Sequence, residues 1–177
     1  MHRNGVEPAT PAQGTDAMDD AITWPLASNV IRGRKVNNTF GMVRKNLDGT
    51  PRPHQGWDFE APVGEPAYAI ADGTVRLVRN AGDYGLQLSM EFTLGGETYY
   101  AFYAHLEKVY VAAGDAVVRN HLIAKCGKTG NAAGLPTSED HLHFEIRTRQ
   151  PPRLGLQDRV SPLTVFGQCP LTTPVAG

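Results

Sequence analysis

Apolar and polar residues alternate in several short segments of the chain, and this period of two is typical of β-strands with one buried face. In Leu86–Leu94, apolar residues occupy every second position. Gly95 and Gly96 follow, and a Gly-Gly pair suits the positive φ angles of a tight hairpin turn. Residues 98–106 are apolar on both faces and rich in aromatic side chains. This predicts a second strand in the centre of the sheet.

Four further segments predict short strands: residues 73–78, 116–118, 122–124 and 141–147. Residues 46–53, with Asn, Asp, Gly and Pro, predict a loop, and no long window has a helical period. We therefore expect one all-β domain over residues 21–167, an antiparallel β-sheet or sandwich. A disordered tail of residues 1–20 should precede it, and a tail of residues 168–177 should follow.

Composition changes this picture little. The 177 residues have a net charge of -1, and 41% are hydrophobic, as in ordinary globular proteins. The absence of a basic excess gives no support for nucleic-acid binding. The sequence contains no run of eighteen apolar residues, the length that a helix needs to span a bilayer. The first twenty residues contain no apolar stretch of signal-peptide length. Three interpretations remain: the chain is mature or trimmed, it is exported without a cleaved signal, or it is cytosolic.

The two cysteines, Cys126 and Cys169, fit no zinc-finger spacing. They are either two unrelated thiols or one disulfide that tethers the C-terminal tail to the domain. A disulfide would contribute about 4 kcal/mol by chain-entropy arithmetic. We favour it only for a protein that works outside the cytoplasm.

The segment around His141 and His143 is the first candidate for chemistry. In a strand, the apolar residues between them point into a core, while His141, His143 and Glu145 point together to the opposite face. Two imidazoles on one face can share a metal ion, or supply one ligand and one catalytic base. The alternative is an ordinary solvated polar face.

His54 and Asp58 form the second candidate. Nearby prolines and Gly56 argue against a helix, so an extended segment must bring the two side chains together, with Gly56 allowing close backbone approach. Imidazole nitrogen and carboxylate oxygen are suitable zinc ligands. Chance polar loops of this kind are common, so this pair alone is weak support.

His105, at the end of the predicted central strand, is the third candidate; alone it would more often be a structural histidine. Catalytic zinc has three protein ligands and one open position. His54, Asp58 and His143 could supply the three ligands. His141 and His105 would then remain as acid–base or transition-state groups.

Three motifs together, His54-x-Gly-x-Asp58, Tyr103-Ala-His105-Leu and His141-Leu-His143-Phe-Glu, resemble those of the lysostaphin-like, or LytM-type, peptidoglycan metallopeptidases. Segments 40–44, 58–64, 71–75, 114–117 and 127–130 are similar to the scaffold of that family, and the resemblance covers residues 24–147. It implies an antiparallel β-sheet of duplicated-hybrid type with a narrow groove for an extended peptide. It also implies one catalytic zinc ion and endopeptidase activity on the cross-links or stem peptides of bacterial peptidoglycan.

The resemblance also implies roles for the residues. His54, Asp58 and His143 look like the zinc ligands, and His141 looks like the general base. His105 looks like the partner that positions water and stabilises the oxyanion.

The connector over residues 131–140 departs from the family pattern, because it is longer and ends in Glu139 and Asp140. We expect it to border the groove, where these two acids would select cationic or amine-bearing peptides; the alternative is a solvated insertion. Tyr84 either lines the groove or simply packs.

Two other functions stay open. A non-catalytic relative would bind cell wall or activate an amidase, but all five site residues are present, which favours an enzyme. A structural zinc domain would use four ligands, often cysteines. We expect a monomer that acts in the cell wall or periplasm after export. Its role would be remodelling, phage lysis or antibacterial attack as an injected effector; only the last implies an immunity protein as partner.

Overall fold

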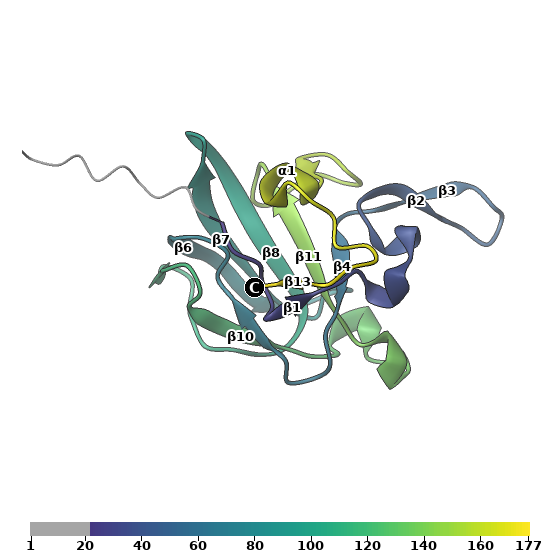
Figure 1. Ribbon diagram of the computed structural model, residues 1–177, viewed down its shortest axis with the longest axis horizontal. Coiled ribbons are helices and arrows are strands. Elements are labelled where there is room, and N and C mark those ends of the chain that lie inside the picture. Colours follow the sequence, from purple (N-terminus) through teal and green to yellow (C-terminus); the bar gives the residue numbers. More distant parts are fainter. Residues whose placement is uncertain (1–21) are drawn as a thin grey trace, which may run out of the picture.

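Antiparallel strands form nearly all the regular structure of residues 22–177, the part of the chain that this computed structural model describes (Figure 1). The strands are β1 (Ser28–Asn29), β2 (Gly41–Lys45), β3 (Pro51–His54), β4 (Trp57–Glu60), β5 (Pro66–Tyr68), β6 (Gly73–Asn80), β7 (Leu86–Leu94), β8 (Glu97–Val109), β9 (Ala116–Val117), β10 (Leu122–Cys126), β11 (His141–Arg147), β12 (Arg159–Val160) and β13 (Val175–Ala176). The helical elements are the single turns η1 (Arg32–Arg34), η2 (Val36–Asn38), η3 (Gly130–Ala132) and η4 (Thr137–Glu139), with α1 (Leu163–Phe166). The predicted tail of residues 1–20 lies outside the described residues.

A nine-stranded sheet carries the domain. Its main path is β12-β11-β8-β7-β6-β9, with β4 paired to β11 and β10 joining β8 to β5. The all-β prediction is confirmed, and β8 lies between β11 and β7 as expected for a strand that is apolar on both faces. β7 and β8 form the predicted hairpin, in which Leu94 opposes Glu97 and both intervening glycines have positive φ angles, 59° at Gly95 and 81° at Gly96.

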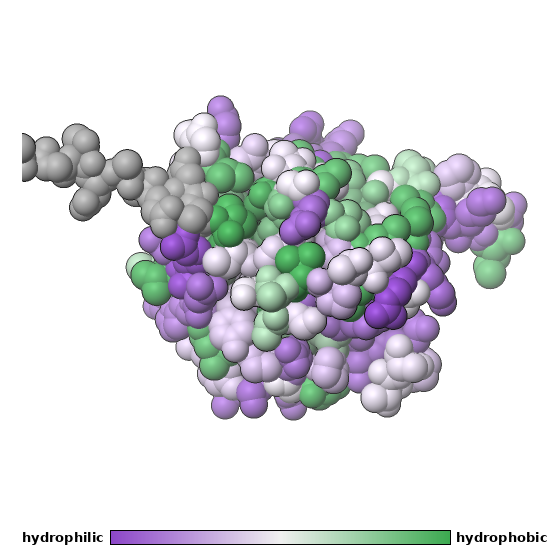
Figure 2. All heavy atoms as spheres, viewed as in Figure 1, coloured by the Kyte–Doolittle hydropathy of each residue, from purple (hydrophilic) through white to green (hydrophobic). Residues whose placement is uncertain are grey.

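The hydrophobic core covers one face of this sheet. Leu142, Phe144 and Ile146 of β11 are fully buried there, and burial of each such side chain contributes about 1.5–3 kcal/mol. Phe166 of α1 packs on Phe144, with ring centroids 5.8 Å apart. Among residues 22–177, no helix is long and apolar enough to cross a membrane. Figure 2 shows hydrophilic and hydrophobic residues interspersed on the viewed face.

The prediction of a loop over residues 46–53 was wrong in part. Only residues 46–50 form a turn, and β2 and β3 on either side of it pair as a hairpin that extends away from the large sheet (Figure 1). β3 contains Pro51 and Pro53 and pairs with β2 alone. An edge strand tolerates prolines because it has positions where no N–H is needed for pairing.

Of the two alternatives for Cys126 and Cys169, the structure contains the two unrelated thiols and not the disulfide. Cys126 is fully buried in the core, whereas Cys169 is exposed, and both thiols are free. Backbone hydrogen bonds hold residues 168–177 to the domain instead. Strand β13 pairs with β1, and the N–H of Ile31 donates to the carbonyl of Pro170 at 2.9 Å.

Candidate metal centre and active site

Three side chains from different strands bring their ligand atoms to one point. Nε2 of His54 lies 3.1 Å from Oδ1 of Asp58, and Nδ1 of His143 lies 2.9 Å from the same oxygen. The two nitrogens are 3.3 Å apart. Ligand atoms around one tetrahedral zinc ion, at about 2.0–2.2 Å from it, lie about 3.3 Å from one another. The three residues therefore fit a single zinc ion, with a fourth position open.

Backbone pairing explains why these residues meet. Asp58 of β4 and His143 of β11 are direct neighbours in the antiparallel ladder. Between His54 and Asp58 the chain passes so close to β11 that a Cβ on Gly56 would collide with the carbonyl oxygen of Phe144. The close backbone approach expected at Gly56 is thus present in the structure.

The nitrogen atoms of the ligand imidazoles that do not face the common point have other partners. Nδ1 of His54 donates to the carbonyl of Thr39 at 2.8 Å, and Nε2 of His143 donates to Oε1 of Glu145 at 3.0 Å. Such contacts fix the tautomer and orient the ring of a metal-ligating histidine. Burial lowers the pKa of His54, which favours the neutral form that a metal ion requires.

Asp58 divides its carboxylate between two tasks. Oδ1 faces the two imidazoles, while Oδ2 accepts hydrogen bonds from Arg44 at 2.6 Å and from Arg32 at 3.2 Å. Burial alone would raise the pKa of Asp58, but its contacts with His143 and His54 outweigh burial and hold the pKa well below its ordinary value. The carboxylate is therefore ionised and can act as a ligand.

Two further imidazoles lie beside the ligands. Nδ1 of His141 donates to the carbonyl of Glu139 at 2.8 Å, and Nδ1 of His105 donates to the carbonyl of Thr129 at 3.0 Å. Their ring centroids are 4.9 Å apart, and Nε2 of His141 is 3.9 Å from Oδ1 of Asp58. Burial lowers both pKa values, that of His105 to about 4. Both rings are therefore neutral at pH 7, with an unprotonated Nε2 that can accept a proton.

A bulge in β8 turns His105 toward the site. Leu88 opposes Tyr103 and Leu86 opposes Leu106, so Gln87 alone faces two residues of β8. His105 takes a φ of 60° at this bulge. Simple alternation would place His105 on the core face with Tyr103, whereas Leu106 occupies that face instead.

A groove of about 580 Å³ contains the five site residues. Asp83 and Tyr84 line one part of it, and Asn131, Leu135 and Glu139 show that the connector over residues 131–140 borders it, as expected. The remaining lining residues are Arg32, Arg44, Arg52, Pro53, His54, Gln55, Asp58, His105, His141 and His143.

Of the three residues expected to bind substrate, Tyr84 and Glu139 line the groove and Asp140 does not. Tyr84 lines the groove, and its hydroxyl donates to Oε1 of Glu145 at 2.7 Å. Glu139 also lines the groove, but its carboxylate lies 3.0 Å from a guanidinium nitrogen of Arg32. The Asp140 side chain is nearly buried and outside the groove lining, with its carboxylate 3.3 Å from Nζ of Lys128.

Several residues that support the site did not stand out in the sequence. Arg32 reaches Asp58 from η1, a segment without a recognisable motif. Glu145 was expected on the histidine face, but not its contact with His143. The period of two in β11 was the available signal for that contact, because it places His143, Glu145 and Arg147 on the same face of the strand.

Known proteins share this sequence pattern and this fold. The sequence pattern of the family described as "Peptidase family M23" matches residues 52–154, more than half of the chain. The peptidoglycan DD-endopeptidase ShyB of Vibrio cholerae is 37% identical over 120 residues, which make up 67% of this chain and 26% of ShyB. The chain thus spans about a quarter of the length of that relative.

Solved structures agree. A zinc containing peptidase from Vibrio cholerae is 31% identical, with a TM-score of 0.57 over 79% of this chain and 39% of that chain. The catalytic domain of lysostaphin from Staphylococcus simulans, 24% identical, has a TM-score of 0.58 over 73% of this chain and 90% of that domain, which shows a common fold. The resemblance to lysostaphin-type peptidases is confirmed, and the chain belongs to peptidase family M23.

Proposed function

We propose that this chain is a zinc-dependent endopeptidase that hydrolyses peptide bonds of bacterial peptidoglycan. One observation carries the proposal: His54, Asp58 and His143 present three ligand atoms within 3.3 Å of one another, beside two neutral imidazoles. A structural zinc site would instead be closed by a fourth protein ligand. The relative named a peptidoglycan DD-endopeptidase supports the substrate class.

The chemistry follows from the protonation states. A zinc ion held by the three ligands would polarise the scissile carbonyl and lower the pKa of a water molecule to about 7. His141 can take the proton of the attacking water on its free Nε2, because its Nδ1 is held by the carbonyl of Glu139. The same nitrogen can then pass this proton to the leaving amine.

His105 has the same tautomer as His141, which limits its role. With Nδ1 donating to Thr129, the neutral ring can position water by accepting a hydrogen bond on Nε2. It can stabilise an oxyanion only after Nε2 has received a proton, because an unprotonated nitrogen cannot donate a hydrogen bond. We therefore propose water positioning as its resting role.

The groove supports two substrate contacts. Tyr84 and Glu139 both line it, and we propose that they touch the bound peptide. Because Glu139 is already paired with Arg32, a cationic peptide would have to compete for its carboxylate. For Asp140, which pairs with Lys128, selection of a cationic substrate stays a sequence prediction.

Digestion of purified peptidoglycan, with the products identified by mass spectrometry, tests the function. The wild type should convert cross-linked muropeptides into smaller fragments. A chelator should stop this cleavage, and added zinc should restore it. His141→Ala should be inactive, whereas His121→Ala, a change to an exposed histidine outside the groove, should retain activity. If zinc binds tightly and nothing is cut, the chain is a binding relative rather than a peptidase.

We propose the periplasm or cell wall as the place of action, because the substrate class is found there. An antibacterial role predicts that the chain harms a bacterium only when it carries an added export signal. Equal harmlessness with and without that signal would argue against this role. It would also remove the reason to expect an immunity protein. The expected monomer can be checked by light scattering.

A further inference from the structure

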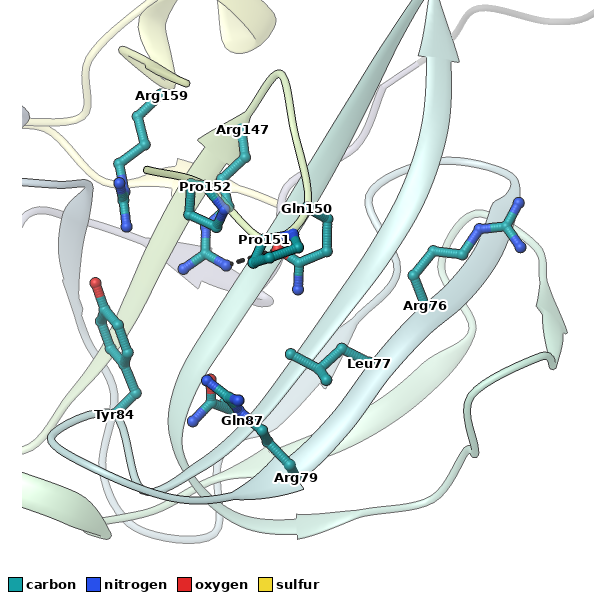
Figure 3. Close-up of a pocket in the computed structure, with 10 residues that line it drawn as sticks. All are labelled: Arg76, Leu77, Arg79, Tyr84, Gln87, Arg147, Gln150, Pro151, Pro152 and Arg159. Carbon is teal, nitrogen blue, oxygen red and sulfur yellow. Dashed lines mark hydrogen bonds between the residues drawn. The ribbon is translucent and has the colours of Figure 1, made fainter. Parts of the chain in front are cut away.

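A second pocket, of about 440 Å³, adjoins the catalytic groove (Figure 3). Tyr84 lines both cavities. The pocket is formed by β6, β7 and β11, by the segment between β11 and β12, and by β12 itself. Its lining residues are Arg76, Leu77, Arg79, Tyr84, Gln87, Arg147, Gln150, Pro151, Pro152 and Arg159.

The charge of this pocket is strongly one-sided. Four arginines line it, and no Asp or Glu is among its lining residues. Arg147 and Arg159 donate to the same oxygen of Glu145, Oε2, at 2.7 and 2.8 Å. Two guanidinium groups thus share one carboxylate, which leaves one positive charge uncompensated.

The arginines of β6 add a second uncompensated charge. Arg76 is paired with Glu91 at 2.8 Å. Arg79 is exposed and has no ion pair within residues 22–177. In Figure 3 the guanidinium of Arg79 lies beside Gln87, below Arg147. The pocket therefore has an excess of about two positive charges after its ion pairs are counted.

Arg147 is also held rigidly. Its guanidinium lies 3.4 Å from the ring centroid of Phe102, and its Nη1 donates to Oε1 of Gln150 at 2.9 Å. Since its Nε and Nη1 are occupied by Glu145 and Gln150, Arg147 contributes a fixed positive charge to the pocket. The exposed guanidinium of Arg79 offers the fork of donors that matches a carboxylate.

We propose that this pocket is a subsite that binds a free carboxylate of the peptide substrate. The proposal rests on the endopeptidase function above and specifies the substrate further. His143 and Arg147 are four residues apart on β11, which is about 13 Å along a strand. An extended peptide with its scissile bond at the metal centre would reach the pocket about four residues away, or fewer with a long acidic side chain.

The alternative is a purely structural role, in which the arginines only hold Glu145 against His143. Arg79 distinguishes the two readings, because within residues 22–177 it is not among the hydrogen-bond partners of Glu145, so its replacement should leave the metal ligands undisturbed. Lys108 of β8 is a matched control, since it is exposed and lines none of the described pockets.

The test uses the zinc-loaded chain and synthetic peptides around the bond that peptidoglycan digestion identifies. A single Glu is moved from the second to the fifth residue on each side of that bond, and each peptide is compared with its Gln analogue. At one position the wild type should favour Glu in kcat/KM by about tenfold. Arg79→Gln should reduce this ratio several-fold, Arg79→Lys should retain most of it, and Lys108→Gln should not change it.

Three results would overturn the subsite. One is a Glu to Gln ratio near one at every position in the wild type. Another is a ratio that Arg79→Gln leaves unchanged, which would assign the pocket a structural role only. The third is that peptidoglycan digestion identifies no cleaved bond, which would refute the endopeptidase function and the subsite with it, whereas the first two leave that function intact.

Discussion

Replacement of Glu145 by Gln should damage both the fold and the metal site. Oε1 of this fully buried carboxylate accepts from His143 at 3.0 Å and from Tyr84 at 2.7 Å, while Oε2 accepts from Arg147 and Arg159. Gln keeps one acceptor oxygen, but its NH₂ group would face either the two guanidinium groups or the two donors at Oε1. Loss of one partner from a buried ion pair costs about 3–5 kcal/mol, a large part of a typical stability of 5–15 kcal/mol.

The pH dependence gives the same prediction a second measurement. Burial alone would raise the pKa of Glu145, but the hydrogen bond from His143 and the charge of Arg147 outweigh burial and hold the pKa well below its ordinary value. A carboxylate with a lowered pKa stabilises the fold above its unfolded pKa, about 4.3, and this contribution is lost as the pH falls. Urea unfolding at pH 7 and pH 3 should therefore show a smaller acid-induced loss in Glu145→Gln than in the wild type.

Zinc affinity is the third quantity, because Glu145 orients a metal ligand. Loss of such a contact typically weakens metal binding by about 10- to 100-fold, which titration against a competing chelator would show. Glu91→Gln is the control, since Glu91 makes an exposed pair with Arg76 on the same sheet, and exposed pairs contribute little. If Glu145→Gln costs no more stability than Glu91→Gln and zinc affinity is unchanged, the reasoning about this network is refuted.

Three further predictions concern other parts of the molecule. Gly56→Ala should destabilise the protein by about 1–3 kcal/mol in urea unfolding, because the new methyl group collides with the carbonyl of Phe144; an unchanged midpoint would contradict the close approach. Since burial lowers the pKa of His141 and lowers that of His105 to about 4, both stay unprotonated at neutral pH. The ring protons of both imidazoles should then titrate below about pH 6.5 when followed by NMR, and a midpoint above pH 7 would argue against neutral bases. Cys169→Ser should change Tm by less than about 2 °C, with or without reductant, because the exposed thiol is free.

The sequence predicted those parts of the fold that depend on local periodicity. Alternation in β11 correctly placed Leu142, Phe144 and Ile146 in the core, and His141 and His143 on the opposite face. The Gly-Gly turn and the central position of β8 were predicted for the same reason, since a period of two follows directly from the pleat.

Features that depend on tertiary contacts could not be predicted in this way. The bulge at His105 changes which residues of β8 face the groove, and it is set by pairing with β7 rather than by a local pattern. Arg32 and Arg159 reach their carboxylates from segments without periodicity. The choice between a disulfide and two free thiols stayed open because sequence spacing does not show that Cys126 is buried and Cys169 lies on the surface.

The hairpin formed by β2 and β3 lies outside the nine-stranded sheet, yet it contributes His54. His54 and His143 are 89 residues apart in the chain. A bound ion would therefore cross-link this projecting hairpin to the large sheet. Without the ion, fewer contacts remain to hold the hairpin, among them the ion pair of Arg44 with Asp58. We therefore expect metal binding to slow hydrogen exchange in residues 41–54, so that this exchange reports the occupancy of the site.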